Sequence, residues 1–175
     1  MNLTSLAVFV AASSFVAVAG AQSKGPSDPQ IAGIVVAANQ IDIDAGKAAK
    51  SRSKNKEVQE FAQLMITDHT AVNKQASALV KKLKVTPEES DTSRALKSAA
   101  KETAAKHKAL KGAAFDKAYA DNEVAYHQQV LDAIDKVLIP NAKNAELKGL
   151  LEKVRPAIAA HLEHAKMMAS SLAKK

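Results

Sequence analysis

Four long segments of this chain carry apolar residues at alternating steps of three and four positions, the spacing of one helical face. They run over about residues 28–51, 56–84, 113–139 and 144–174. The second segment keeps the pattern throughout, at Val58, Ala62, Met65, His69, Val72, Ala76, Leu79 and Leu83. A single helix cannot bury such a stripe, so the four helices must pack against one another. The sequence therefore predicts an all-α fold, an antiparallel four-helix bundle.

One further segment, residues 91–111, is rich in Lys and Ala and has only a weak apolar stripe, which predicts an extra peripheral helix. The composition agrees with a helical protein, because 47% of the 175 residues are apolar and only 3% are aromatic. A β-sandwich would need more β-branched and aromatic residues. The chain has no Cys, which excludes disulfides, thiolate zinc sites and thiol catalysis.

Capping residues and prolines mark the expected helix ends. Asp28 is expected to cap the first helix, with Pro29 at its first position. Pro140 is expected to end or kink the helix over residues 113–139. Pro156 is expected to kink the last helix or to open one of its backbone hydrogen bonds.

The first 21 residues are predicted to be an export signal. Residues 6–18 form an uncharged apolar run that is short for a membrane span and has the length of a signal-peptide apolar region. Ala19, Gly20 and Ala21 follow as a small-residue cleavage pattern. No Lys or Arg precedes the run, and the alternative is an uncleaved anchor. We expect a flexible leader over residues 22–28, a folded domain over 29–174, and a location in the periplasm or at the envelope.

Three of the five histidines lie on the apolar stripes of three different predicted helices, each near the middle of its helix. They are His69, His127 and His161. Antiparallel helices of similar length place their midpoints in one layer, so the three imidazoles are predicted to approach one another in the interior. Asp42 of the first helix lies at the same depth, and Glu123 lies one turn before His127.

A layer of His, Asp and Glu is the usual material of a metal site in a bundle core. The candidate ligands are His69, His127, His161, Asp42, Glu123 and His164, and the candidate outer partners of these ligands are Asp68 and Tyr126. Imidazole suits Zn, Cu, Fe or Ni, so the expected cofactor is one such ion. The alternative is a structural layer in which the histidines bond to carboxylates and water. Met65, Met167 and Met168 are expected to fill the core rather than to bind copper.

Three segments of the chain resemble a known family. They are Phe-Ala-Gln-Leu-Met-Ile-Thr-Asp-His at 61–69, Phe-Asp-Lys-Ala-Tyr at 115–119 with His127 eight residues on, and Pro-Ala-Ile-Ala-Ala-His-Leu-Glu-His-Ala at 156–165. In this order and spacing they resemble the bacterial exported proteins of domain-of-unknown-function family 4142, often labelled predicted outer membrane proteins. The resemblance covers about residues 30–172 and implies a ferritin-like fold, without a settled activity.

The chain departs from the metal-binding pattern of the ferritin-like class. That class places a Glu-x-x-His motif on two of its helices. No Glu lies three residues before His69, His127 or His161. A mononuclear, His-rich site therefore fits these residues better than a di-iron oxidase centre.

The chain carries a net charge of +7, and its surplus lysines cluster at the end of the second helix and on the peripheral helix. They are Lys81, Lys82, Lys84, Lys97, Lys101, Lys106, Lys108 and Lys111. A solvated face is the simpler interpretation, and the functional one is peripheral contact with an anionic envelope surface through the Lys-rich peripheral helix. Nucleic acid is not expected as a partner, because no aromatic residues interleave these lysines.

Three functions follow as hypotheses. The first is an exported bundle that binds a transition metal for storage, buffering or stress protection. The second is a non-catalytic envelope or stress protein with a structural His layer and a basic face that binds an anionic partner. The third is a metal-dependent oxidase or peroxidase, which needs a substrate pocket and an open coordination position that no sequence feature indicates. The sequence favours a binding protein over an enzyme.

Overall fold

The computed structural model describes residues 25–174, and within them every regular element is a helix. The elements are α1 (Asp28–Arg52), α2 (Lys56–Leu83), α3 (Asp91–Lys108), α4 (Gly112–Ala133), the π-helix η1 (Ile134–Leu138), α5 (Ile139–Asn141) and α6 (Ala145–Leu172). The predicted all-α class is confirmed. Residues 1–21, the predicted export signal, lie outside the described part of the chain, as do residues 22–24 of the predicted leader.

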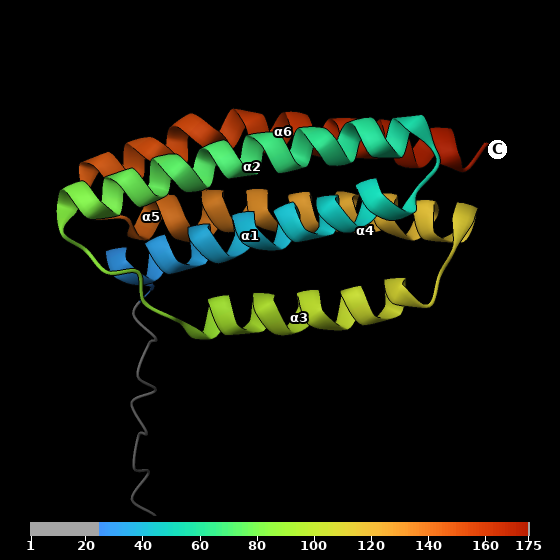
Figure 1. The fold of residues 1–175 in the computed structure, drawn as a ribbon. Helices are drawn as coiled ribbons and strands as arrows, with labels where there is room; N and C mark the ends of the chain where they lie inside the picture. Colours follow the sequence, from blue (N-terminus) through green and yellow to red (C-terminus); the bar gives the residue numbers. More distant parts are fainter. Residues whose placement is uncertain (1–24, 175) are drawn as a thin grey trace, which may run out of the picture.

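Figure 1 shows α1, α2, α4 and α6 lying side by side, with α3 along the outside. Each neighbouring pair among the four long helices runs antiparallel, so that α1 opposes α2 and α4, and α6 opposes the same two helices. Because α2 and α4 run in the same direction, the chain must return to the starting end between them. The helix α3 makes this return, and it packs mainly against α1.

Two apolar cores fill the interior, one towards each end of the four long helices. The first includes Phe61, Tyr119 and Met168, and the second includes Ile31 and Leu151. In each of the four helices, the residues on one side of its midpoint belong to one core, and the residues on the other side belong to the other core. The middle of each of the four helices therefore lies between the two cores, and most of the buried polar residues lie in this layer: Asn39, Asp42, His69, Glu123, His127 and His161.

The first residues of α1 differ from the expectation. Ser27, rather than Asp28, is the N-cap, because its hydroxyl accepts from the Gln30 backbone N–H while the Gln30 side chain accepts from the Ser27 N–H. The carboxylate of Asp28 accepts instead the backbone N–H groups of Lys143 and Asn144, at 2.8 and 2.9 Å. The assignment of Asp28 as the cap was wrong because its partners lie more than 110 positions away in sequence. Asp28 joins the start of α1 to the start of α6.

The two interior prolines have different effects. Pro140 lies in α5 after the π-turn, and this long helix ends at Asn141, as the sequence predicted. Within η1 the backbone bonds are one residue longer than in an α-helix, as in the bond from the Ile139 N–H to the Ile134 carbonyl. Pro156 lies inside α6, which continues through it as one helix. Within residues 25–174, no helix has both the length and the apolar character needed to span a membrane.

Candidate metal centre

The layer between the two apolar cores brings together polar side chains from all four long helices. Asp42 comes from α1, His69 from α2, Glu123 and His127 from α4, and His161 from α6, and none is more than 5% exposed. One ring nitrogen of each histidine lies within 4.8 Å of a ring nitrogen of the other two. One ligand atom from each of Asp42, Glu123 and His127 meets the same limit. The structure thus brings together five of the six predicted ligands.

The side chain of Asn39 fixes the orientation and the tautomer of His69. The Asn39 amide nitrogen donates to the Val35 carbonyl at 2.7 Å, which leaves its Oδ1 facing His69 as an acceptor. His69 Nδ1 lies 2.7 Å from this oxygen and must therefore carry the hydrogen. The other ring nitrogen, Nε2, then carries the lone pair in the neutral imidazole, and it lies 2.7 Å from Asp42 Oδ2.

His127 is held in the same way by a backbone carbonyl. Its Nδ1 donates to the Glu123 carbonyl oxygen one turn earlier, at 2.9 Å. Its Nε2 lies 3.2 Å from Asp42 Oδ2, the same oxygen that His69 faces. Two neutral imidazoles would thus direct lone pairs at one carboxylate oxygen, which is repulsive. The arrangement needs a positive charge at this point, supplied either by protons or by a metal cation.

His161, from α6, is the third histidine of the layer. Its Nε2 donates to Asp68 Oδ2 of α2 at 2.9 Å, and Asp68 is partly open to solvent. Its Nδ1 is buried and has no hydrogen-bond partner within the described residues. All three histidines therefore share one arrangement: one ring nitrogen is bound to an acceptor, and the other is buried, facing Asp42 in His69 and His127 and without a partner among residues 25–174 in His161. Metal-binding histidines are held by this kind of outer contact.

Comparison with known proteins identifies the family. The chain matches the family model described as "Domain of unknown function (DUF4142)" over residues 14–168. The chain belongs to this family. The predicted family membership is thus confirmed, and no curated protein matches this DUF4142 chain.

A solved structure described as "CopM in the Cu(II)-bound form" is similar to the DUF4142 chain, with a TM-score of 0.62 and 15% sequence identity. The similarity covers 83% of this chain and 98% of that one. At this identity the likeness establishes a shared fold and nothing about ligands.

The two buried carboxyl groups of this DUF4142 chain differ in charge. Burial would raise the pKa of Asp42, but hydrogen bonds from His127 and His69 outweigh burial and hold that pKa far below its usual value. Burial raises the pKa of Glu123 well above its usual value, and the negative charge of Asp42 raises it further. These shifts favour the carboxylate form of Asp42 and the protonated form of Glu123. Burial also lowers the pKa of His161, which favours its neutral form.

Two of the predicted site residues have other contacts. His164, a predicted ligand, belongs to neither group of converging ligand atoms, and its ring lies edge-on to Phe61 with ring centroids 5.0 Å apart. Tyr126, a predicted outer partner, donates its hydroxyl to the Ala38 carbonyl at 2.8 Å and meets His127 only ring to ring. Asp68, the other predicted outer partner, bonds directly to His161.

Two residues near the layer were missed by sequence reasoning. Asn39 holds His69, and its only sequence signal is its position three residues before Asp42 on the same side of α1. Tyr119 is 1% exposed and its hydroxyl has no hydrogen-bond partner within residues 25–174. Burial raises its pKa above the usual value, and the nearby carboxyl groups of Glu123 and Asp42 raise it further. Its position on the apolar face of α4 is typical of an ordinary aromatic core residue.

Proposed function

We propose that this protein is an exported, ferritin-like four-helix bundle that binds one transition-metal ion in its central layer. His69, His127 and His161 are the main ligands, and Asp42 and Glu123 assist. The observation that carries the proposal is the set of three imidazoles from three helices, each with one nitrogen held by an acceptor and with ring nitrogens that converge within 4.8 Å. Two of these imidazoles also face the buried carboxylate of Asp42, and a shared cation would serve the carboxylate and all three rings.

Copper is the first ion to test. Imidazole binds Zn, Cu, Fe and Ni, and within such nitrogen sites Cu²⁺ has the highest affinity of the divalent first-row ions. The structural neighbour is described in a Cu(II)-bound form, and its similarity extends over most of both chains. Storage, buffering or stress protection in the periplasm is the role that fits a buried site on an exported binding protein.

The experiment is elemental analysis of the protein purified without chelator or affinity tag, then loaded with Cu, Zn, Ni or Fe and desalted. We expect about one metal ion per chain. The triple variant His69→Ala, His127→Ala, His161→Ala should retain none. His107→Ala is the matched control, because His107 lies outside the layer, at the end of α3 with its ring against Phe115. It should bind as the unaltered protein does.

Two results would contradict the proposal. One is the lack of stoichiometric metal after loading with each of these ions. The other is a triple variant that retains the metal of the unaltered protein. A triple variant that merely unfolds is distinguished by circular dichroism, and single His→Ala variants then replace it.

We also propose that α3 faces an anionic envelope surface. Lys101, Lys106 and Lys108 are exposed on this helix, while Lys97 is paired with Glu89. Sedimentation with phosphatidylglycerol vesicles at low salt should recover the protein, and added salt should release it. A Lys101→Ala, Lys106→Ala, Lys108→Ala variant should sediment less; equal sedimentation would contradict this role.

A further inference from the structure

An apolar cavity of about 90 Å³ lies beside the metal-ligand layer. Its walls come from α1, α2, α4, η1 and α6, with α3 at its outer side. Most of the lining is aliphatic, and it includes Leu96, Val130, Ala133, Ile134, Val154 and Ile158. This volume is larger than the roughly 30 Å³ that one water molecule occupies in the liquid. It is smaller than the cavities of about 150 Å³ that bind benzene.

The ligand layer forms one end of this cavity. His69 and His127 line it, together with Asn39 and Tyr126. The polar atoms of these outer groups are already engaged, since Asn39 bonds to Val35 and His69, and the Tyr126 hydroxyl bonds to Ala38. A bound water needs two to four polar partners, and apolar cavities without them stay dry. The cavity therefore suits an uncharged, apolar occupant rather than water or a hydrated ion.

A π-helix and the proline-containing part of α6 border the same cavity. Ile134 and Leu138 of the π-helix η1 line it from one side. Val154 and Ile158 line it from α6, on either side of Pro156, which cannot make the normal backbone hydrogen bond. π-turns occur often at functional sites. The π-helix η1 thus lies directly against this internal space.

A second space adjoins the cavity beneath α3. It is a larger groove of about 520 Å³, lined by residues of α1, α3 and α4. Leu96, Tyr126 and Gln129 line both this groove and the inner cavity. Gln129 is exposed, and Ser93 is the only buried side chain of α3. The groove beneath α3 and the cavity beside the two histidines thus share part of their lining.

We propose that the cavity binds a small, uncharged, apolar molecule of the size of dioxygen, next to His69 and His127. Binding in the cavity depends only on its size and its walls. That the bound molecule then lies beside a metal ion rests on the proposed function. The test therefore uses the metal-free protein, so that failure to bind metal and failure to bind in the cavity are separate results.

The experiment is methyl NMR of the metal-free protein under rising pressure of xenon, and separately of dioxygen. We expect saturable xenon shifts at the methyl groups of Val130 and Ile158, which line the cavity. The same groups should broaden first under paramagnetic dioxygen. The methyl groups of Val58, which is fully buried in the other core, should respond to neither gas.

The variant Ala133→Leu places a larger side chain in the cavity and should weaken xenon binding by about tenfold or more, a change of about 1.4 kcal/mol. Ala118→Leu is its matched control, because it makes the same change at a half-buried position of α4 away from the cavity. Val154→Ala should enlarge the cavity and raise xenon uptake, which gives a second test if Ala133→Leu folds poorly. Uniform, non-saturating shifts, or equal xenon binding in all three variants, would overturn the proposal.

Discussion

Oδ2 of Asp42 lies 2.7 Å from Nε2 of His69, and both atoms are buried away from solvent. The opposite nitrogen of His69 already donates its hydrogen to Asn39. A contact this short therefore requires a proton on Nε2 or a cation between the two groups. Metal ligands must lose their protons to bind, so a metal ion and a proton compete for this position. The contacts around this pair, from Asn39 and Glu123, can therefore be tested by substitution.

Asn39→Ala should lower metal affinity by about 10- to 100-fold, the usual cost of losing an outer contact to a metal-bound histidine. Without the amide, the His69 ring can rotate and exchange tautomers. Fixing one orientation and one tautomer when the metal binds then costs conformational entropy. Competition titration against a chelator measures the effect. Asn73→Ala is the control, because Asn73 is half-buried one turn after His69 on α2. Equal affinity in the two variants would contradict the role assigned to Asn39.

Glu123→Gln should make the metal-free protein more stable at neutral pH. The raised pKa of Glu123 means that the folded state keeps a proton that the unfolded state releases above its ordinary pKa near 4.5. The stability that this group contributes is thus present below pH 4.5 and is lost as pH rises towards the folded-state pKa. Each pKa unit of this shift costs about 1.4 kcal/mol, and the neutral glutamine avoids that cost.

The stabilising effect of Glu123→Gln should therefore grow as pH rises from about 4.5 to 7. Urea unfolding of both proteins at several pH values in this range measures it. Metal affinity should change in the opposite direction, because glutamine cannot supply a carboxylate ligand. A gain in stability that does not depend on pH would contradict the assigned proton, even if metal affinity falls.

The helices and the central layer could be predicted from the sequence because both depend on local periodicity. A histidine on an apolar stripe must face the interior, and its position along the helix gives its depth. His69, His127 and His161 were found in this way. Which histidine each partner meets could not be predicted, because this depends on how each helix is rotated about its axis. Asp68 was predicted as an outer partner and bonds to His161, whereas Asn39, beside the stripe of α1, was missed.

Other features depend on contacts that no periodic pattern records. Asp28 bonds across the chain to Lys143 and Asn144 rather than capping its own helix. His164 lies one turn after His161, yet its ring meets Phe61 instead of the layer. The apolar cavity is formed by six elements packed together, and no single segment of sequence contains it.

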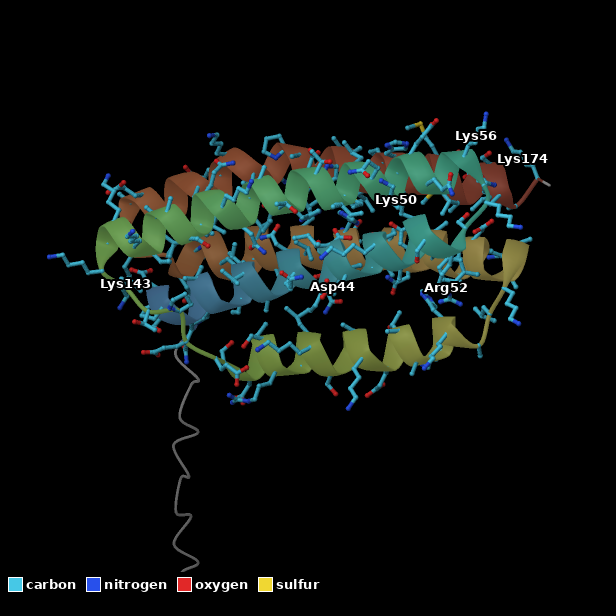
Figure 2. The ribbon with its side chains drawn as sticks, viewed as in Figure 1. Asp44, Lys50, Arg52, Lys56, Lys143 and Lys174 are labelled. Atoms are coloured by element: carbon cyan, nitrogen blue, oxygen red, sulfur yellow. The ribbon has the colours of Figure 1, made fainter. Side chains whose placement is uncertain are left out.

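Arg52→Ala should loosen the end of α3. One guanidinium nitrogen of Arg52 donates to the carbonyls of His107, Lys108 and Leu110 at 2.8–3.3 Å, and the group stacks on the Phe115 ring at 4.2 Å. Figure 2 shows Arg52 between the end of α1 and the end of α3. Because the site is exposed, the loss in unfolding free energy should be modest, about 1 kcal/mol.

Hydrogen exchange measures the local effect of Arg52→Ala. Amides in the last turn of α3 should exchange faster, while those in the middle of α2 should not change. Arg52→Lys should restore little of the amide protection, because an ammonium group cannot bond to three carbonyls and stack on a ring at the same time. Lys50→Ala, two positions away and paired with Gln63, is the control. Equal exchange in the last turn of α3 for the Lys50 and Arg52 variants would contradict this role.

Gly33→Ala and Gly149→Ala form a matched pair with opposite expected signs. Both residues lie inside long helices, where alanine favours the helix by about 0.5–1 kcal/mol over glycine. A Cβ at Gly33 would lie 2.0 Å from the backbone oxygen of Glu88, in the loop that the Glu88 N–H ties to the Pro29 carbonyl. A Cβ at Gly149 would meet no atom of the described residues within 4 Å. Gly149→Ala should therefore stabilise the protein by the propensity gain, and Gly33→Ala should destabilise it by about 1–3 kcal/mol. Chemical denaturation of the two variants measures the difference, and a stabilising Gly33→Ala would show that the loop after α2 does not pack against α1 as closely as described.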